Sequence, residues 1–418
     1  MVPGKALSGD SQGPPAGWLE RAALWCAIGS AGAIAASIAV SQLLLGAALL
    51  LLIILVATRR LRLRLPSGWP LLAFFIAWTV LSWLVNGHLR EGLPQIRKFY
   101  VLLIVVVIAS LFRGVRDARW VALLWVVLAT ASGLWGIWQF WQRWHAAQLV
   151  GKDFYLEYVA ARITGFNSHW MTFSQQLMLA LACGLAMLLW DRDATPPRRW
   201  VLGAAGAVCG LGILLAETRG VWFATAAALI YLLWCWRRWT VVLLPVLALL
   251  AFAAGPQGLR ERMLSVARPH GEKDSNMHRY VTFRTGLEMI KSHPLLGLGP
   301  EMPGREFSSY VPPDIHRPLP EGFYGHLHNI YTHFAAERGL PAMFAMIGFL
   351  VWNAVLWLRR LRGSPGEAAW VLRAGVAMLL GILATGIFEH NLGDSEILTM
   401  TMAAVAFTDC ALREAQHV

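Results

Sequence analysis

Charged residues are scarce in this sequence: Asp, Glu, Lys and Arg make up 14% of its 418 residues. Soluble globular proteins carry about 25%, so the shortage excludes a soluble enzyme and a disordered protein. Cysteine is also scarce, which excludes a disulfide-rich secreted module. The five cysteines lie within or at the ends of apolar runs and lack the pair spacing of a metal site, so we interpret them as small buried apolar residues. They are Cys26, Cys183, Cys209, Cys235 and Cys410.

Apolar residues dominate the rest. Hydrophobic side chains make up 57% of the sequence, with 21 Trp and 18 Phe, and the mean hydropathy is +0.53. Stretches long enough to cross about 30 Å of hydrocarbon recur along the chain, which predicts an all-α polytopic membrane protein with about 12 transmembrane helices. The predicted spans are 22–40, 42–58, 69–86, 99–112, 120–141, 170–190, 200–216, 221–236, 240–254, 329–358, 368–388 and 396–412.

The basic residues predict which side of the membrane each loop faces. With both termini inside, 19 of the 36 Lys and Arg residues lie in inner segments, and nine of the other 17 lie in one long outer loop. The positive-inside rule does not count long loops, so we expect both termini in the cytoplasm. The net charge of +12 is spread over short clusters between the spans, and no nucleic-acid partner is expected.

These observations predict the organisation of the whole chain. Its first residues are rich in Gly, Pro and Ser and resemble a cytoplasmic tail more than a cleaved signal peptide. We expect a tail at 1–20, spans one to nine within 21–254, a large outer loop with helices of its own at 255–328, spans ten to twelve within 329–412, and a tail at 413–418. Eleven of the twelve histidines fall on the outer side or at its membrane edge, so polar chemistry is expected there.

The segment 276–300, NMHRYVTFRTGLEMIKSHPLLGLGP, contains two arginines of interest. It is predicted to be helical until Pro294, which disfavours helix at the residue before it. Arg284 has Glu288 four residues later, a spacing that favours a surface ion pair. Arg279 has an aromatic residue at that spacing and no acid. It is therefore a candidate for binding a phosphate, which a guanidinium contacts through two parallel hydrogen bonds.

Two further arginines lie at the outer edge of predicted spans. Arg219 stands in the short turn AETRGVWF, and short outer loops tend to avoid arginine. The alternatives to a functional role are an ion pair with Glu217 or contact with lipid head groups. Arg162 precedes the sixth span, where an ion pair with Glu157 or Asp153 is an equal alternative.

The strongest candidate is in segment 325–341, GHLHNIYTHFAAERGLP. His328 and Asn329 stand where the long loop meets the tenth span, and the dipole at a helix N-terminus would hold the imidazole neutral and able to accept a proton. Gly339 would lie on the same face of a continuous helix, about 16 Å deeper, where it would allow a close helix contact or leave room for a lipid chain. His326 is a rival two residues away, and a lone histidine here is more commonly an interfacial hydrogen-bonding group.

Signals for metal or nucleotide chemistry are missing from the sequence. Asp191-Arg192-Asp193 has the D-x-D form of metal-dependent glycosyltransferases, but it falls on the inner side among arginines. We interpret it as loop charge. No zinc-site spacing, P-loop or Gly-x-Ser-x-Gly turn occurs, so neither a metal nor a cofactor is expected.

Taken together, these segments resemble a known family. His328-Asn329, nine residues and then Gly339 match the H-[N/S/Q]-x9-G pattern of the O-antigen ligase family, whose superfamily includes O-antigen polymerases and bacterial O-oligosaccharyltransferases. The segment from Arg279 to the end of HPLLGLG resembles the stretch before that histidine, T-R-G at 218–220 its external arginine turn, and R-x-x-G at 162–165 an earlier loop. Pro341 departs from a frequent second glycine.

The resemblance implies an inner-membrane glycosyltransferase of the GT-C type. It would transfer O-antigen from undecaprenyl pyrophosphate to lipid A-core on the periplasmic face, with inversion and without metal. His328 would be the general base, and Arg219 and Arg279 would be catalytic by stabilising the pyrophosphate. The residues expected to contact substrates are Arg162, Arg284, Asn329, Gly339 and His326.

Three alternatives remain open. An O-oligosaccharyltransferase is disfavoured because the sequence ends six residues after the last predicted span, without a soluble extension. An O-antigen polymerase is harder to separate from a ligase. A polytopic transporter is disfavoured because the polar residues cluster at the outer edge rather than near mid-membrane.

Overall fold

The computed structural model describes residues 17–151, 154, 158, 161–255, 260, 263–264, 275–361 and 366–417. Every regular element in these ranges is a helix, and ten helices are long and apolar enough to cross a membrane. The chain is therefore an all-α polytopic membrane protein, as the sequence predicts. The helices in chain order are α1 Trp18–Ala33, α2 Ile38–Ala57, α3 Trp69–Asn86, α4 Leu89–Arg97, α5 Phe99–Leu111, α6 Val115–Val150, α8 Trp170–Trp190, α9 Pro196–Leu215, α10 Arg219–Trp236, η1 Arg238–Val242, α11 Leu243–Ala254, α13 Ser275–Ser292, α14 Met302–Arg305, η3 Phe307–Ser309, α15 Ile330–Arg338, α16 Leu340–Arg360, α17 Ala368–Thr385, η5 Asn391–Gly393 and α18 Ser395–His417.

Two of the twelve predicted spans correspond to described helices that are shorter than the membrane thickness, and ten of the described helices are long and apolar enough to cross it. The first predicted span corresponds to α1, whose 16 residues reach about 24 Å at 1.5 Å per residue. The ninth corresponds to α11, which has 12 residues and continues η1. A hydrocarbon core of about 30 Å requires roughly 20 residues of helix.

The tenth predicted span is not one helix. It is divided into α15 and α16 at Gly339, which has φ 85° and ψ 163°. This part of backbone space is accessible essentially only to glycine, so the chain changes direction there. Gly339 therefore does not lie on the helix face that continues from His328, and the expectation of a continuous helix through 329–358 is corrected.

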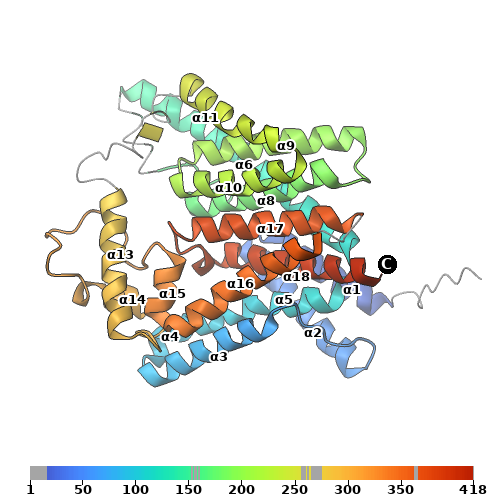
Figure 1. The fold of residues 1–418 in the computed structure, drawn as a ribbon, viewed down its shortest axis with the longest axis horizontal. Helices are drawn as coiled ribbons and strands as arrows, with labels where there is room; N and C mark the ends of the chain where they lie inside the picture. The colour runs from blue at the N-terminus through green and yellow to red at the C-terminus, as the bar shows by residue number, and fades with distance from the viewer. Residues whose placement is uncertain are drawn as a thin grey trace, which may run out of the picture.

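The most buried helices are α8, α17 and α18, whereas α2 and α3 expose most of their length. The exposed side chains of α2 are large and apolar, including Leu43, Leu50 and Ile53. Large exposed apolar surfaces of this kind are favourable in contact with lipid chains and unfavourable in contact with water. The α10 helix packs against α17 and α8 (Figure 1), and Gly220 in its first turn lies against Phe388 in the connection between α17 and α18.

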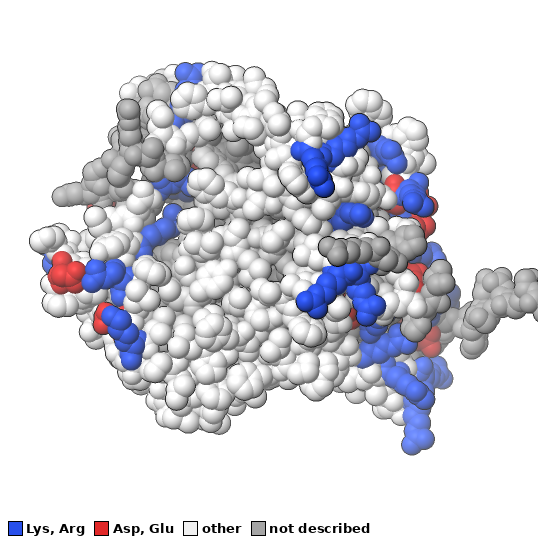
Figure 2. All heavy atoms as spheres, in the orientation of Figure 1, with Lys and Arg blue, Asp and Glu red and all other residues white. Residues whose placement is uncertain are grey.

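The two ends of the helix bundle differ in content. α13 runs across the ends of the bundle helices rather than along them, at the end opposite the C-terminus (Figure 1). The first described residues and the C-terminus share the other end. Lysine and arginine gather at that second end (Figure 2), which is the arrangement that the positive-inside rule predicts for a cytoplasmic face.

Candidate functional site

Arg219 is the first residue of α10 and follows a tight turn after α9. Glu217 in that turn has a left-handed backbone with φ 49°, an uncommon conformation for a residue other than glycine. Arg219 is buried, and its Nη2 donates a hydrogen bond of 2.8 Å to Oδ1 of Asn276 on α13. The turn thus directs a buried guanidinium toward the helix that crosses the end of the bundle.

One face of α13 turns toward Arg219. Residues three and four positions apart share a helix face, and the four residues of α13 that line the cavity follow this spacing: Asn276, Arg279, Tyr280 and Phe283. α13 ends at Ser292, as the proline at 294 predicts. The guanidinium carbon of Arg279 lies 6.0 Å from the centre of the Phe388 ring, between α17 and α18.

Arg284 has different partners from those expected. Its guanidinium donates to the Tyr280 hydroxyl at 2.8 Å and pairs with Asp314 at 3.1 Å. Glu288, the partner that the helical spacing favoured, pairs with Lys291 instead. Arg284 is absent from the residues that line the cavity of Arg279.

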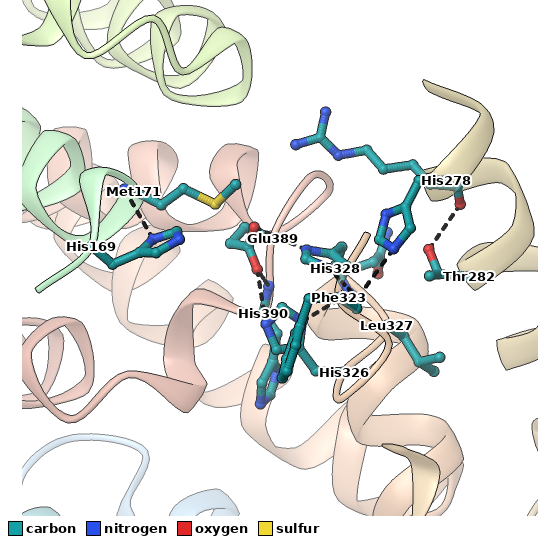
Figure 3. Close-up of polar contacts among 12 residues, drawn as sticks. His169, Met171, His278, Thr282, Phe323, His326, Leu327, His328, Glu389 and His390 are labelled. Atoms are coloured by element: carbon teal, nitrogen blue, oxygen red, sulfur yellow. Dashed lines mark hydrogen bonds and ion pairs between the residues drawn. The ribbon is translucent and has the colours of Figure 1, made fainter. Parts of the chain in front are cut away.

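His328 is held by its backbone and by both ring nitrogens. Its φ of 49° is left-handed. Nδ1 lies 3.2 Å from Oε2 of Glu389, and Nε2 lies 3.0 Å from the carbonyl oxygen of Phe323 (Figure 3). Both partners carry hydrogen-bond acceptors, and the two contacts fix the orientation of the ring.

Asn329 begins α15 as its N-cap. Its Oδ1 accepts hydrogen bonds from the backbone N–H groups of Tyr331 at 2.9 Å and Thr332 at 3.0 Å. Its Nδ2 donates to the carbonyl oxygen of Ile387 at 2.9 Å. A side chain that satisfies the free N–H groups of a first turn stabilises the helix by about 1 kcal/mol. Asn329 therefore fixes the start of α15 and ties it to the connection between α17 and α18.

Glu389 is the centre of a group of histidines and was not among the predicted site residues. His326 Nε2 lies 3.6 Å from its Oε1 and His328 Nδ1 lies 3.2 Å from its Oε2. Burial raises the pKa of this carboxyl group, but the hydrogen bond with His328 and the charges of His328, His326 and Arg279 outweigh it and lower the pKa to about 2. Glu389 is therefore a carboxylate that holds the His328 ring.

His278, on α13, is a second residue that the sequence analysis did not select. Its Nε2 lies 3.1 Å from the carbonyl oxygen of Phe323, which also contacts His328. Burial and the nearby His328 charge lower the pKa of His278 to about 4, so it is neutral near pH 7. Burial likewise lowers the pKa of His326 to about 3, although Glu389 acts in the opposite direction.

These elements enclose a cavity of about 450 Å³ at the α13 end of the bundle. Of the eight predicted site residues, it brings together Arg219, Arg279, His328 and Asn329. The remaining lining side chains are mostly aromatic or aliphatic, among them Phe223 and Phe388. The cavity thus combines two cations, one imidazole and an apolar wall.

Arg162 and Gly339 lie outside this lining. Arg162 is buried beside the α9–α10 turn, with Nη1 3.4 Å from the Glu217 carbonyl oxygen and its guanidinium 5.0 Å from the Trp170 ring centre. Its two alternative partners at 153 and 157 fall outside the described residues. Gly339 packs on the backbone of Leu295, where any Cβ would collide with the carbonyl oxygen.

A metal ion would find one possible ligand set among the described residues: His326, His328 and Glu389, with ligand atoms within 4.8 Å of one another. Two histidines and a carboxylate suit several transition metals. The same three groups also contact one another directly without a metal, with the Glu389 carboxylate between the two imidazoles. Their separation along the chain, between 326–328 and 389, explains why sequence spacing did not indicate them.

Residues 204–347 match the family model described as O-Antigen ligase. The match supports membership of the O-antigen ligase family and confirms the family predicted from the sequence motifs. It also supports a glycosyltransferase of the ligase or polymerase type. The matched segment contains Arg219, Arg279 and His328 but not Glu389. No curated protein matches the chain.

Proposed function

We propose that the chain transfers O-antigen polysaccharide from undecaprenyl pyrophosphate to lipid A-core at the periplasmic face of the bacterial inner membrane. The observation that carries the proposal is the shared cavity of Arg219, Arg279 and His328. Glycan transfer from a lipid pyrophosphate needs cations for the leaving group and a base for the acceptor, and these three side chains supply both.

The two arginines would hold the pyrophosphate. As the bond between the anomeric carbon and the pyrophosphate oxygen breaks, negative charge grows on the leaving group. Fixed cations aimed at that charge lower the barrier without a metal ion. The link between Arg219 and Asn276 keeps one guanidinium in place before the donor arrives, so little reorganisation accompanies the reaction.

His328 would remove the proton from the acceptor hydroxyl. Glu389 holds Nδ1, so Nε2 is the nitrogen that would serve the acceptor, and it now contacts the Phe323 carbonyl oxygen. The acceptor hydroxyl would take the place of that carbonyl, and its proton would pass to Nε2 once this nitrogen is unprotonated. The hydroxyl oxygen then attacks the anomeric carbon opposite the leaving pyrophosphate, which inverts the configuration.

The apolar wall of the cavity suits the lipid part of the donor. Phe223 lies on the wall and is 53% exposed, so the cavity borders the surface that faces lipid. An isoprenoid chain in the bilayer would reach the pyrophosphate position from this side. Both substrates are membrane lipids, which is consistent with a cavity at one end of the spanning helices.

A gene disruption examined on a lipopolysaccharide gel tests the proposal. Loss of a ligase leaves lipid A-core without any O-antigen, whereas loss of a polymerase leaves core with a single repeat. Purified protein in detergent should also transfer glycan between two lipids. Detergent micelles have no two compartments, so a transporter would give no signal in this assay. A single-repeat band would replace the ligase with the polymerase, and failure to transfer glycan between any lipids would overturn both.

A further inference from the structure

A second and larger cavity, of about 770 Å³, lies at the arginine-rich end of the molecule, opposite the proposed catalytic cavity. It forms where the start of α1, the α2–α3 connection, the turn between α5 and α6, and the end of α18 meet. Its rim carries six arginines: Arg21, Arg60, Arg62, Arg64, Arg113 and Arg116.

The acidic residues of this cavity are largely committed to the backbone. Asp117 Oδ2 accepts a hydrogen bond of 2.8 Å from the N–H of Arg113, and Glu414 Oε2 accepts one of 2.7 Å from the N–H of Val115. These bonds satisfy N–H groups at the start of α6. Glu20 lies 3.5 Å from the Arg113 guanidinium. Among the described residues, the other five rim arginines have no carboxylate within ion-pair distance.

Other arginines near this end are accommodated differently. Arg119 pairs with Asp191 at 2.9 Å, and Arg237 and Arg238 lie over tryptophan rings. The positive-inside rule accounts for arginine at this end of the bundle. It does not account for six arginines around one cavity in which two of the three acids bond to backbone N–H groups.

The inner wall of the cavity is apolar. Leu24, Ile28 and Phe112 contribute to it, and Trp25 and Trp120 meet edge to face at 5.8 Å between ring centres. Both tryptophans are about half exposed, on a surface that a bilayer would cover. A free phosphate ion needs only the cations, whereas a phospholipid needs the cations and an adjoining apolar wall.

We propose that this cavity binds an anionic phospholipid. The rim arginines would contact its phosphodiester, and an acyl chain would lie along Trp25, Trp120 and Ile28. Each basic residue near an anionic head group contributes about a factor of five to binding. The lipid would join the segments around α1, α2, α6 and α18 at one point, and the proposal is independent of the glycan chemistry at the other end.

The test uses purified full-length protein, delipidated in an uncharged detergent. Phosphatidylglycerol and phosphatidylcholine with identical acyl chains are added separately, and retained lipid is counted by native mass spectrometry. We expect preferential retention of phosphatidylglycerol. Replacing Arg60→Gln, Arg62→Gln and Arg64→Gln together should weaken it by about fivefold per arginine. The matched control is Arg192→Gln, Arg199→Gln and Arg237→Gln, which removes three exposed arginines from the same end outside the cavity and should change it little.

A second variant covers the case in which the triple variant does not fold. Leu24→Trp fills part of the apolar wall and keeps every charge, and it should also weaken phosphatidylglycerol retention. Equal retention of the two lipids, or equal losses in the rim and control triple variants, would overturn the proposal. Displacement of phosphatidylglycerol by the same concentration of inorganic phosphate would also overturn it, because the site would then be one for a free anion.

Discussion

The imidazole of His328 is oriented by two kinds of constraint. Its backbone is in the left-handed region, with φ 49°, which costs about 1–3 kcal/mol for a residue other than glycine. Its ring lies between Glu389 and the Phe323 carbonyl oxygen. Strained residues persist where surrounding contacts hold them, and such residues concentrate at functional sites. The ring direction is therefore set before a substrate arrives.

We expect His328→Ala to fold and to bind the lipid donor but to lose transfer activity by roughly 10²–10⁴-fold, because the acceptor hydroxyl loses its base. The variant is to be compared with wild type at matched expression across a range of pH. His326→Ala is the control, since His326 is absent from the cavity lining, and its effect should be much smaller. A fully active His328→Ala enzyme would remove the base assignment.

Arg219→Ala and Arg279→Ala should each reduce transfer by about 10²–10³-fold, the loss typical of a removed charge-stabilising donor. Arg→Lys at either position should restore little, because an ammonium cannot make the paired contact with phosphate. Arg284→Ala provides the comparison: Arg284 pairs with Asp314 outside the cavity lining, and a smaller loss is expected. Near-normal transfer by both alanine variants would contradict the pyrophosphate assignment.

Chelation tests whether His326, His328 and Glu389 bind a metal ion that transfer requires. If the three side chains serve one another as a carboxylate between two imidazoles, transfer should survive EDTA unchanged. Activity lost in chelator and restored by a divalent metal would show instead that the three groups are ligands. The control is the Glu389→Gln variant, whose residual activity should be equally insensitive to EDTA.

Sequence reasoning selected four of the residues that share the cavity because each belongs to a recognisable local pattern. Arg219 stands in an outer turn, Arg279 lacks an acid at helical spacing, and His328 and Asn329 begin a helix. Glu389 and His278 have no such local signature. Their importance arises from contacts across segments distant in the chain, although Glu389-His390-Asn391 is a polar run between two apolar spans and was a usable signal.

At the scale of elements, the break between α15 and α16 explains a motif. α15 ends early, and the backbone N–H groups of Leu298 and Gly299 donate to the carbonyl oxygens of Ala336 and Glu337 at 2.9 Å each. The HPLLGLG segment thus satisfies carbonyl groups that a continuous helix would have used. Gly339 permits this because nothing larger fits against Leu295.

Gly339→Ala should therefore destabilise the protein rather than alter its chemistry. The backbone conformation alone costs about 1–3 kcal/mol for alanine, and the added Cβ collides with the Leu295 carbonyl oxygen. We expect a lower thermal midpoint in detergent and reduced yield. Gly203→Ala in α9, where no atom lies within 4 Å of a new Cβ, is the control. A Gly339→Ala protein as stable as wild type would contradict this packing.

The membrane-spanning helices were the most predictable elements, because their length and apolar composition are local properties. The break at 339 could not be predicted, because the pattern of apolar residues continues across it. The packing of Gly339 on Leu295 involves two segments more than forty positions apart along the chain. A twelve-span expectation also counted α1 and α11, which are apolar but short.

At the scale of the molecule, the uneven charge predicts orientation. The arginine-rich end would face the cytoplasm, and α13 and the cavity of Arg219, Arg279 and His328 would face the periplasm. Single cysteines in a cysteine-free background test this. Asp314 is exposed, and a cysteine in its place should react with a membrane-impermeant maleimide in cells whose outer membrane is permeabilised and whose inner membrane is intact. A cysteine at Arg199 should react only after the inner membrane is disrupted, and the reverse pattern would invert the topology.

The connection between α17 and α18 has a consequence for biogenesis. Ile387 and Phe388 line the cavity that contains Arg219, Arg279 and His328, and Glu389 holds His328, yet all three are synthesised after α16 and α17. A nascent chain on the ribosome therefore carries both arginines and the histidine long before it carries the residues that complete their surroundings. The cavity is complete only when the α17–α18 connection lies beside α10, so a chain shortened after α16 would keep the whole segment that matches the family model and lack these lining residues.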